Sequence, residues 1–183
     1  MKISITGHTS GIGKSLFNLL TSLGHEVVGF SRRNGYDISK DSALIVEQTK
    51  DCDVFINNAY HADAQQSLLK EILAIWEGQT KTVVNISSQI IYKEDSPMYQ
   101  GEQLEYKISK TKLSNFVKEY TGSIAIKDVV PALVNTDFYI TPPMFKNLPS
   151  IEPDALAQII VSSMSNLSKE VIVDSVGTVS YKF

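Results

Sequence analysis

The first 30 residues constrain the fold more than any other part of the chain. Residues 2–6 alternate around two isoleucines, which predicts a short strand, and a glycine-rich turn follows at residues 6–13. Apolar residues between positions 14 and 23 have the spacing of a helix with one buried stripe. Residues 26–30 are typical of a second strand. This order predicts a βαβ unit, with parallel strands and a right-handed crossover.

The same alternation continues along the chain. Its expected strands are near-continuous apolar runs, as in parallel sheets covered on both faces. We expect helices over residues 40–50, 63–77, 102–120 and 153–166, and strands over residues 53–57, 82–87, 124–130 and 171–173, the last in the sheet. A length of 183 residues favours a single domain over residues 1–183. The predicted fold class is α/β, a single Rossmann-like doubly wound parallel sheet with helices on both faces.

Charge and cysteine content exclude several classes. The net charge of −3 argues against a strongly basic nucleic-acid-binding surface. The one cysteine, Cys52, rules out an intramolecular disulfide and is expected in the core. No apolar run reaches the ~18 residues of a membrane span, and a strand that starts at Lys2 leaves no room for a signal peptide, so we expect a cytoplasmic protein. His8, His25 and His61 are far apart, and we expect no metal site.

The glycines at positions 7, 11 and 13 indicate a phosphate-binding turn. They would let the backbone approach a pyrophosphate, while the start of the following helix offers free N–H groups. A glycine-rich turn without a ligand is the alternative. A nucleoside triphosphate loop fits poorly, because Lys14 and Ser15 follow but the four-residue spacer between the glycines is missing.

The end of the second predicted strand favours NADP over NAD. NAD sites usually place an acid about 20 residues beyond the glycines. This chain has Ser31, Arg32 and Arg33 there, and its first acid is Asp37. Two guanidinium groups suit a 2′-phosphate, although one of them could belong to a solvated basic turn.

Several further motifs then follow in order, and with them the chain resembles the short-chain dehydrogenase/reductase family. The resemblance covers residues 1 to about 174. The matching segments are Thr6–Gly13, Asp37-Ile38, Asn57-Asn58-Ala59, Ser87-Ser88, Tyr106 with Lys110, and Pro131–Thr136. Tyr60 and Ala132 stand where the family usually has glycine.

The resemblance implies that the catalytic residues are Ser88, Tyr106 and Lys110. Tyr106 and Lys110 are four residues apart on a predicted helix, so they share a face, and a nearby ammonium is expected to lower the pKa of the phenol. In carbonyl reduction Tyr106 would protonate the oxygen and Ser88 would donate a hydrogen bond to it, although Ser87 could take that place. By the same resemblance, Lys110 would also hold the nicotinamide ribose.

The resemblance also implies a cofactor site along the whole edge of the sheet. Val134 and Thr136 would contact the carboxamide, Asp37 and Ile38 the adenine, and Asn58 with Ala59 the length of the cofactor. The full expected set is Gly7, Ser10, Gly11, Ile12, Gly13, Ser31, Arg32, Arg33, Asp37, Ile38, Asn58, Ala59, Lys110, Val134 and Thr136.

Some intervals depart from the family pattern. The stretch before Asn57 looks trimmed, so the family's third strand and its helix are expected to be vestigial, whereas residues 93–101 look like an insertion. The family's proton-relay Asn is absent between Tyr60 and Val83, and Gln65, Gln66 and Gln79 remain open as substitutes. The brief segment after Thr136 suggests an open pocket, with apolar walls from Phe138, Tyr139, Met144 and Phe145. Tyr92 faces either substrate or, as we expect, packing neighbours or solvent.

Taken together, the residues and the resemblance predict an NADP(H)-dependent oxidoreductase domain that interconverts a small-molecule carbonyl and an alcohol. A catalytically weak or inactive NADP-binding regulator or scaffold is the alternative. An epimerase or dehydratase is less consistent with 183 residues, because such enzymes have longer substrate-binding regions. We expect no nucleic acid or membrane partner, and by analogy a homodimer or homotetramer formed through the helix at 102–120.

Overall fold

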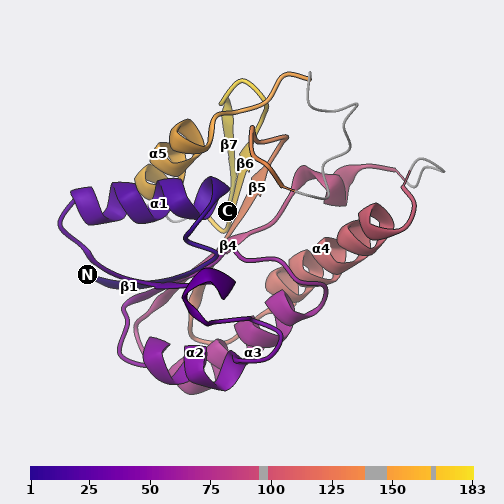
Figure 1. Cartoon of the computed structure of the whole chain (residues 1–183). Helices are drawn as coiled ribbons and strands as arrows, with labels where there is room; N and C mark the ends of the chain where they lie inside the picture. The colour runs from indigo at the N-terminus through magenta and orange to yellow at the C-terminus, as the bar shows by residue number, and fades with distance from the viewer. Residues whose placement is uncertain (95–98, 139–147, 166–167) are drawn as a thin grey trace.

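The computed structural model contains one seven-stranded sheet with helices on both faces (Figure 1). It describes residues 1–94, 99–138, 148–165 and 168–183. The strands are β1 (Lys2–Thr6), β2 (Glu26–Phe30), β3 (Val54–Asn57), β4 (Thr82–Ile86), β5 (Ala125–Pro131), β6 (Glu170–Val173) and β7 (Val179–Lys182). The helices are α1 (Gly11–Ser22), α2 (Ser42–Thr49), α3 (Ala64–Trp76), α4 (Glu102–Glu119) and α5 (Pro153–Ser163), with short 3-10 turns η1 (Arg32–Asn34) and η2 (Gln89–Tyr92).

The strand order is β2-β1-β3-β4-β5-β6-β7, and the first six strands are parallel. This confirms the predicted α/β class and the βαβ opening. The expectation that residues 171–173 form the last strand is wrong, because β7 pairs with β6 in the antiparallel direction. The alternation in β7 was too short to be recognised, and the strand lies at an exposed edge.

The trimmed interval before Asn57 corresponds to a missing strand. The family pattern places its Asn-Asn-Ala motif after a fourth strand, but here the motif follows β3, which pairs directly with β1. Only η1 and α2 lie between β2 and β3. The strand that was expected to be vestigial is therefore absent from this fully described segment, and β2 forms the edge of the sheet.

Two apolar layers hold the helices to the sheet. Successive residues of a strand point to opposite faces, so Val54 and Ile56 pack with Leu16 of α1, while Phe55 packs with Trp76 of α3 on the other face. Figure 1 shows α1 and α5 on one side of the sheet and α2, α3 and α4 on the other. The expected core position of Cys52 is confirmed by its complete burial.

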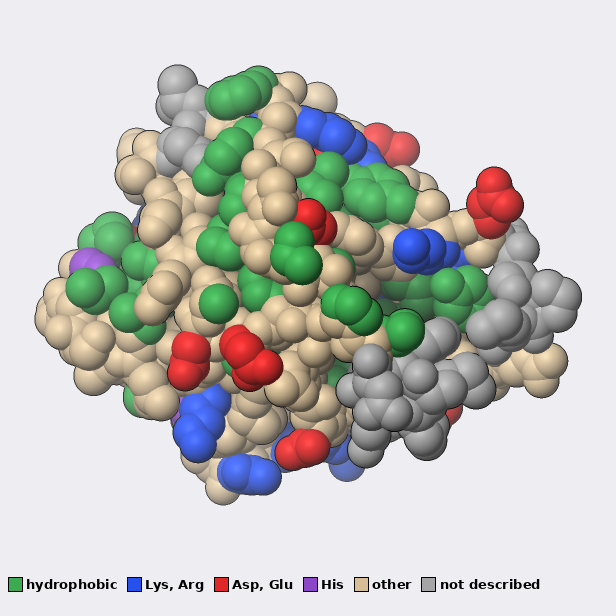
Figure 2. Space-filling model, turned by 90° about the horizontal axis from the view of Figure 1, so that it is seen from above, with side chains coloured by type: hydrophobic (Ala, Val, Ile, Leu, Met, Phe, Trp, Pro, Cys, Tyr) green, Lys and Arg blue, Asp and Glu red, His purple; other side chains and the backbone are tan. Residues whose placement is uncertain are grey.

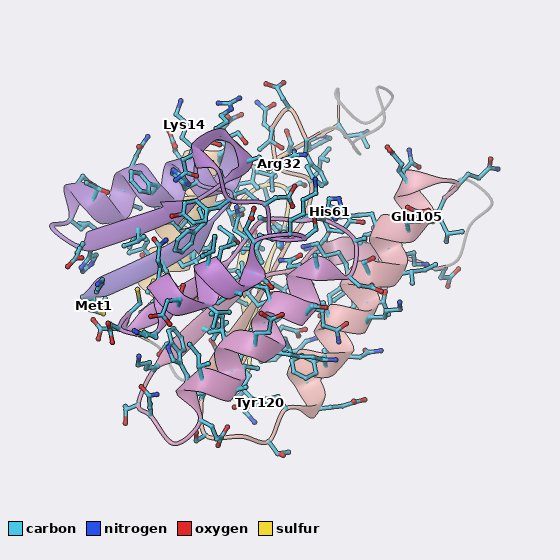
Figure 3. The ribbon with its side chains drawn as sticks, turned by 60° about the horizontal axis from the view of Figure 1, so that its bottom comes forward. Met1, Lys14, Arg32, His61, Glu105 and Tyr120 are labelled. Atoms are coloured by element: carbon cyan, nitrogen blue, oxygen red, sulfur yellow. The ribbon has the colours of Figure 1, made fainter. Side chains whose placement is uncertain are left out.

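The carboxyl ends of the parallel strands meet at one edge, where the connecting loops gather. Figure 3 places Arg32 and His61 at the same end of the molecule as Lys14 in the first turn of α1 and Glu105 in the first turn of α4, with Tyr120 at the opposite end. Open α/β sheets bind their ligands at this edge.

Candidate active site

The glycine turn is a tight junction between β1, α1 and β3. Gly7 and Gly11 have φ values of +74° and +51°, where a side chain would strain the backbone. A Cβ atom on Gly13 would lie 2.2 Å from the carbonyl oxygen of Gly7, so the helix can approach the strand only with glycine at this position.

The first turn of α1 is open to an anion. Ser10 precedes it in an extended conformation without a side-chain cap, and no acidic residue lies in the first turn. The N–H groups of Gly11, Ile12 and Gly13 belong to this uncapped turn. These residues fit a pyrophosphate, because a helix start with free donors and a bare backbone favours negative charge.

The segment that follows β3, residues 58–60, is called the strap here, and hydrogen bonds join it to the glycine turn. Thr6 Oγ1 accepts hydrogen bonds from the N–H groups of Asn58 and Ala59 at 3.0 and 2.9 Å. Asn58 Nδ2 donates to the carbonyl oxygen of Thr6 at 2.9 Å. Two segments that are 50 positions apart in the sequence therefore form one surface, and both carry predicted cofactor contacts.

The basic end of β2 reaches the same turn. Arg33 Nη1 donates to the carbonyl oxygen of Thr9 at 3.4 Å, and both arginines are exposed. His8 of the turn lies across β2: a Cβ atom on Gly29 would come within 2.3 Å of its ring. Arg33 thus contacts the glycine turn, and Arg32 precedes Arg33 in η1.

The other predicted contacts at this end have local structural partners. Ser31 precedes η1 and forms a capping box with Asn34. The Asp37 carboxylate accepts hydrogen bonds from the backbone and hydroxyl of Ser39, which lower its pKa. Ile38 is 7% exposed and packs in the core. Asp37 remains near the surface, whereas most of the Ile38 side chain is turned inward.

Ser88, Tyr106 and Lys110 converge at the end of β4. The Ser88 side chain lies close enough to the Tyr106 phenol to act on its pKa. Lys110 lies one helical turn beyond Tyr106 on α4, with its Nζ atom 5.6 Å from the centre of the phenol ring. Ser88 Oγ also accepts from the N–H of Ile90 at 3.3 Å, whereas Ser87 Oγ is buried without a partner among the described residues. Ser88 is therefore the serine that reaches Tyr106.

Burial shifts the pKa values of Tyr106 and Lys110 in opposite directions. It raises the pKa of Tyr106 to about 12, although the hydrogen bond from Ser88 acts to lower it. It lowers the pKa of Lys110 to about 7, and the negative charge of Asp128 opposes that shift. The expected net lowering of the phenol pKa is thus not found, because desolvation outweighs the other influences. Tyr106 retains its proton at neutral pH.

The rings of Tyr60 and Phe138 pack against the ring of Tyr106. The ring of Tyr60 meets that of Tyr106 edge-on at 4.8 Å, and Phe138 lies 5.5 Å from Tyr106 and 6.1 Å from Tyr60. Lys110 Nζ lies 5.8 Å from the Tyr60 ring centre. Tyr60 stands where the family pattern has glycine, so it narrows the space beside the phenol.

The segment after β5 closes the other side of the turn. A Cβ atom on Gly11 would come within 3.1 Å of Thr136 Cγ2, and Val134 pairs with Ile151. Phe138 takes the predicted place in the wall. Tyr139, Met144 and Phe145 lie outside the described residues, as do residues 95–98 of the predicted insertion.

Gln65 was one of three glutamines left open by the sequence, and the structure brings it to the site. Lys110 Nζ donates to Gln65 Oε1 at 2.8 Å and to the carbonyl oxygen of Ile86 at 2.7 Å. Asn57, Asn85 and Asp128, which sequence reasoning did not assign to the site, are buried behind it. Part of their signal was available, because each is a polar residue in a mostly apolar strand.

Other candidate features lie away from these residues. A hollow of about 490 Å³ between η2 and α4 is lined by Ile91, Leu104 and Ile108 among others, but not by Ser88, Tyr106 or Lys110. Tyr92 contacts Glu170 rather than the site. Across the described ranges no group of His, Cys, Asp or Glu has a metal-binding arrangement, and no helix there is long and apolar enough to cross a membrane. Lys, Arg, Asp and Glu are interspersed on the face shown in Figure 2.

Comparison with known proteins identifies the fold. No protein-family model and no curated protein sequence matches the chain. A 3-ketoacyl-(acyl-carrier-protein) reductase from Brucella melitensis, complexed with NADH, is 18% identical over 95% of this chain and 96% of its own, with a TM-score of 0.75. A 3-alpha-hydroxysteroid dehydrogenase from a Pseudomonas species, also with NADH, is 19% identical over 96% of both chains, with a TM-score of 0.72. A short-chain dehydrogenase from Burkholderia cenocepacia in complex with NADP is 17% identical over 93% of this chain and 86% of its own, with a TM-score of 0.70.

The architecture is therefore that of a Rossmann-like α/β protein. More particularly, its fold matches those of solved short-chain dehydrogenases and reductases.

Proposed function

We propose that this chain is an NADP(H)-dependent oxidoreductase that interconverts a carbonyl and an alcohol, with Tyr106 as the acid and base. The observation that carries the proposal is the convergence of Ser88, Tyr106 and Lys110 at the end of β4. The fold relatives support it, since the printed descriptions of several name a dehydrogenase or reductase with a bound nicotinamide cofactor.

In this proposal a bound nicotinamide cofactor supplies or accepts the hydride. Tyr106 donates its proton to the substrate oxygen during reduction, a role suited to a phenol that is protonated at neutral pH. Ser88 donates a hydrogen bond to the same oxygen. Lys110 supplies positive charge next to the phenol as the proton leaves, and it holds the ribose.

Arg32 and Arg33 carry the proposed preference for NADPH. Both are exposed at the end of β2, and Arg33 contacts the backbone of the glycine turn. A guanidinium binds a phosphate through two parallel hydrogen bonds, whereas the described end of β2 offers no acid at the position that usually binds a 2′-hydroxyl.

Tyr60 favours a second candidate, a cofactor-binding regulator or scaffold with little turnover. Its ring occupies the space beside Tyr106 where the family pattern has no side chain. A protein of this kind would retain the phosphate-binding turn while the aromatic rings obstruct the substrate.

One experiment separates the two candidates. NADPH and NADH are titrated by fluorescence, and a panel of aldehydes and ketones is then screened with the wild type and Tyr106→Phe. The oxidoreductase requires NADPH oxidation that the substitution abolishes. Cofactor binding without turnover on any member of the panel favours the regulator, and Tyr60→Gly then tests whether the ring is the obstacle.

A further inference from the structure

A row of buried polar residues crosses the sheet behind the site. Asn57 of β3 is in register with Asn85 of β4, and Asn85 is in register with Asp128 of β5. The neighbours of these residues along the strands, Ile56 and Val129 among them, belong to the apolar layer under α1 and α5. By strand alternation the three polar side chains therefore point to the face covered by α3 and α4.

The row is continuously hydrogen-bonded. Asn85 Nδ2 donates to Asp128 Oδ1 at 2.6 Å, and Asn57 Nδ2 donates to Asn85 Oδ1 at 2.9 Å. Gln65 Nε2 of α3 donates to the carbonyl oxygen of Asn57 at 2.8 Å. Lys110 Nζ of α4 completes the row by donating to Gln65 Oε1 at 2.8 Å. Asn57, Asn85, Gln65, Lys110 and Asp128 are all at most 3% exposed.

The two charged ends fix the direction of every amide between them. An ionised carboxylate only accepts, so Asn85 must present its NH₂ group to Asp128 and its oxygen to Asn57. An ammonium only donates, so Gln65 must present its oxygen to Lys110. Reversing Asn85 would place two oxygens 2.6 Å apart. Gln65 and Asn85 therefore both direct their oxygens toward the cationic side of the row and their NH₂ groups toward the anionic side, while Asn57 Oδ1 is buried without a partner among the described residues.

The surroundings of Asp128 leave Lys110 as its counter-charge. Ser114 Oγ of α4 donates to Asp128 Oδ2 at 3.2 Å. Glu170 of β6 is next in register and repels it, and Tyr92 of η2 also faces this region. Glu170 has cations of its own, Lys182 at 2.8 Å and Lys118 at 3.7 Å. Within the described part of the chain, no lysine or arginine forms a direct ion pair with Asp128.

We propose that Asp128 is the buried counter-charge of Lys110, and that Asn85, Asn57 and Gln65 are positioning residues that join the two. Asp128 stabilises the ammonium form of Lys110, and Gln65 with the Ile86 carbonyl sets the position of Nζ beside Tyr106. The attraction is mutual, since Lys110 lowers the pKa of Asp128 while burial and Glu170 raise it to about 6.

Asp128→Asn tests the charge alone, because asparagine can keep an oxygen toward Asn85. The readout is the pKa of Lys110, measured by NMR of protein whose lysines carry ¹³C at the ε position. The signal of Lys110 is assigned by its loss in Lys110→Met. The other groups that face Lys110 are the rings of Tyr60 and Tyr106, and both remain in the variant. We expect the pKa of Lys110 to fall by at least about half a unit.

An unchanged Lys110 pKa in a folded Asp128→Asn variant would overturn the proposal, since a purely structural network loses stability without moving that titration. If Asp128→Asn does not fold, the titration of Lys110 in the wild type tests the proposal instead. The ε-methylene signal of Lys110 must then show a second step at the pH where the Asp128 carboxyl titrates, and a single step refutes the coupling.

Gln65→Leu tests the position, with Gln66→Leu on the same helix as the matched control. This arm rests on the proposed oxidoreductase function. We expect Gln65→Leu to lower kcat about tenfold with little change in KM, and Gln65→Asn to restore part of it. Loss of both parameters equally in the two leucine variants would count against a positioning role. If the wild type shows no turnover, the proposed function fails, whereas the Lys110 titration still tests Asp128.

Discussion

At the scale of single residues, the site is governed by desolvation. Tyr106 and Lys110 are neighbours on α4, yet burial moves their pKa values apart from the usual 10.0 and 10.5, to about 12 and about 7. Both shifts favour the neutral form, because a charged side chain loses its hydration when it is buried. The phenol of Tyr106 is therefore protonated at neutral pH, and it lies beside a lysine whose pKa is about 7.

Tyr106→Phe removes the proton donor and preserves the ring. We expect kcat to fall by roughly 10²–10⁴-fold, the usual contribution of a positioned acid or base, with cofactor affinity within about threefold of the wild type. Steady-state kinetics and fluorescence titration measure the two effects. Tyr92→Phe is the matched control, because Tyr92 bonds to Glu170 outside the site. Equal turnover of Tyr106→Phe and the wild type would exclude the proposed acid.

Replacing Arg32 and Arg33 together by alanine should weaken NADPH at least about tenfold and NADH much less, since only NADPH carries the phosphate that pairs with them. The dissociation constants of NADPH and NADH, measured at two salt concentrations, test this prediction. Lys40→Ala, which changes an exposed lysine further along the chain, controls for the loss of positive charge. Equal weakening of both cofactors would remove the basis for the NADP preference.

At the scale of elements, the critical junction is the one between β1, α1 and the strap after β3. Gly13 is buried against the carbonyl oxygen of Gly7 and against Asn58 Nδ2, 2.2 and 2.6 Å from where a Cβ atom would lie. The same strap leads through Tyr60 to Tyr106. We therefore expect a change in this junction to affect both the glycine turn and the surroundings of Tyr106.

Gly13→Ala should destabilise the protein by about 1–3 kcal/mol, the usual cost of forcing extra atoms into a packed site, although alanine normally favours helix. Urea denaturation measures the loss, and NADPH titration should show weaker binding. Asn18→Ala, at an exposed position of α1, provides the control and should be neutral or slightly stabilising. A stable Gly13→Ala variant would show that the junction tolerates a methyl group.

Most elements follow from local sequence patterns. The parallel strands are mostly apolar runs, and α1, α3 and α5 each bury an apolar stripe, whereas α2 and α4 show little apolar periodicity. The predicted ranges differ from the observed ones mainly at their ends, as at α1 and α5. β7 could not be found, because its residues are largely exposed and the strand depends on pairing with β6. The loss of a strand before Asn57 was visible only as a short interval in the sequence.

The residues of the candidate site also fall into two groups, those that sequence motifs predict and those that only the structure reveals. Ser88, Tyr106 and Lys110 belong to recognisable motifs, so sequence could bring them together as a hypothesis. The row from Asn57 to Asp128 depends on the register between strands, which no local pattern encodes. Gln65 could not be separated from Gln66 and Gln79, because only its placement on the inner face of α3 distinguishes it.

At the scale of the whole molecule, we expect residues 1–183 to unfold as one domain. The seven strands form one sheet, and Trp76, the sole tryptophan, is fully buried in the layer between the sheet and its helices. Its fluorescence should therefore report a single cooperative transition in urea, coincident with the loss of circular dichroism. Two separate transitions would contradict the single-domain proposal.

Asp128 makes that stability depend on pH. Its pKa is raised from 3.8 to about 6 in the folded protein, so the folded state binds more protons between these values. The contribution of this group to stability is full below about pH 4 and is lost as the pH rises through 6. Relative to Asp128→Asn, the wild type should lose on the order of 2–3 kcal/mol between pH 4 and 7. Urea titrations at these pH values measure the difference, and a constant difference would contradict the raised pKa.

The contact between His8 and Gly29 affects the order in which substitutions at these two positions can occur. The imidazole lies where a side chain at position 29 would have to go, so a larger residue there first requires the His8 ring to move or to be replaced. Along a line of descent the two substitutions are therefore expected in that sequence and not in reverse. Histidine at position 8 therefore favours glycine at position 29, and the residues that the glycine turn can accept depend in part on the neighbouring strand β2.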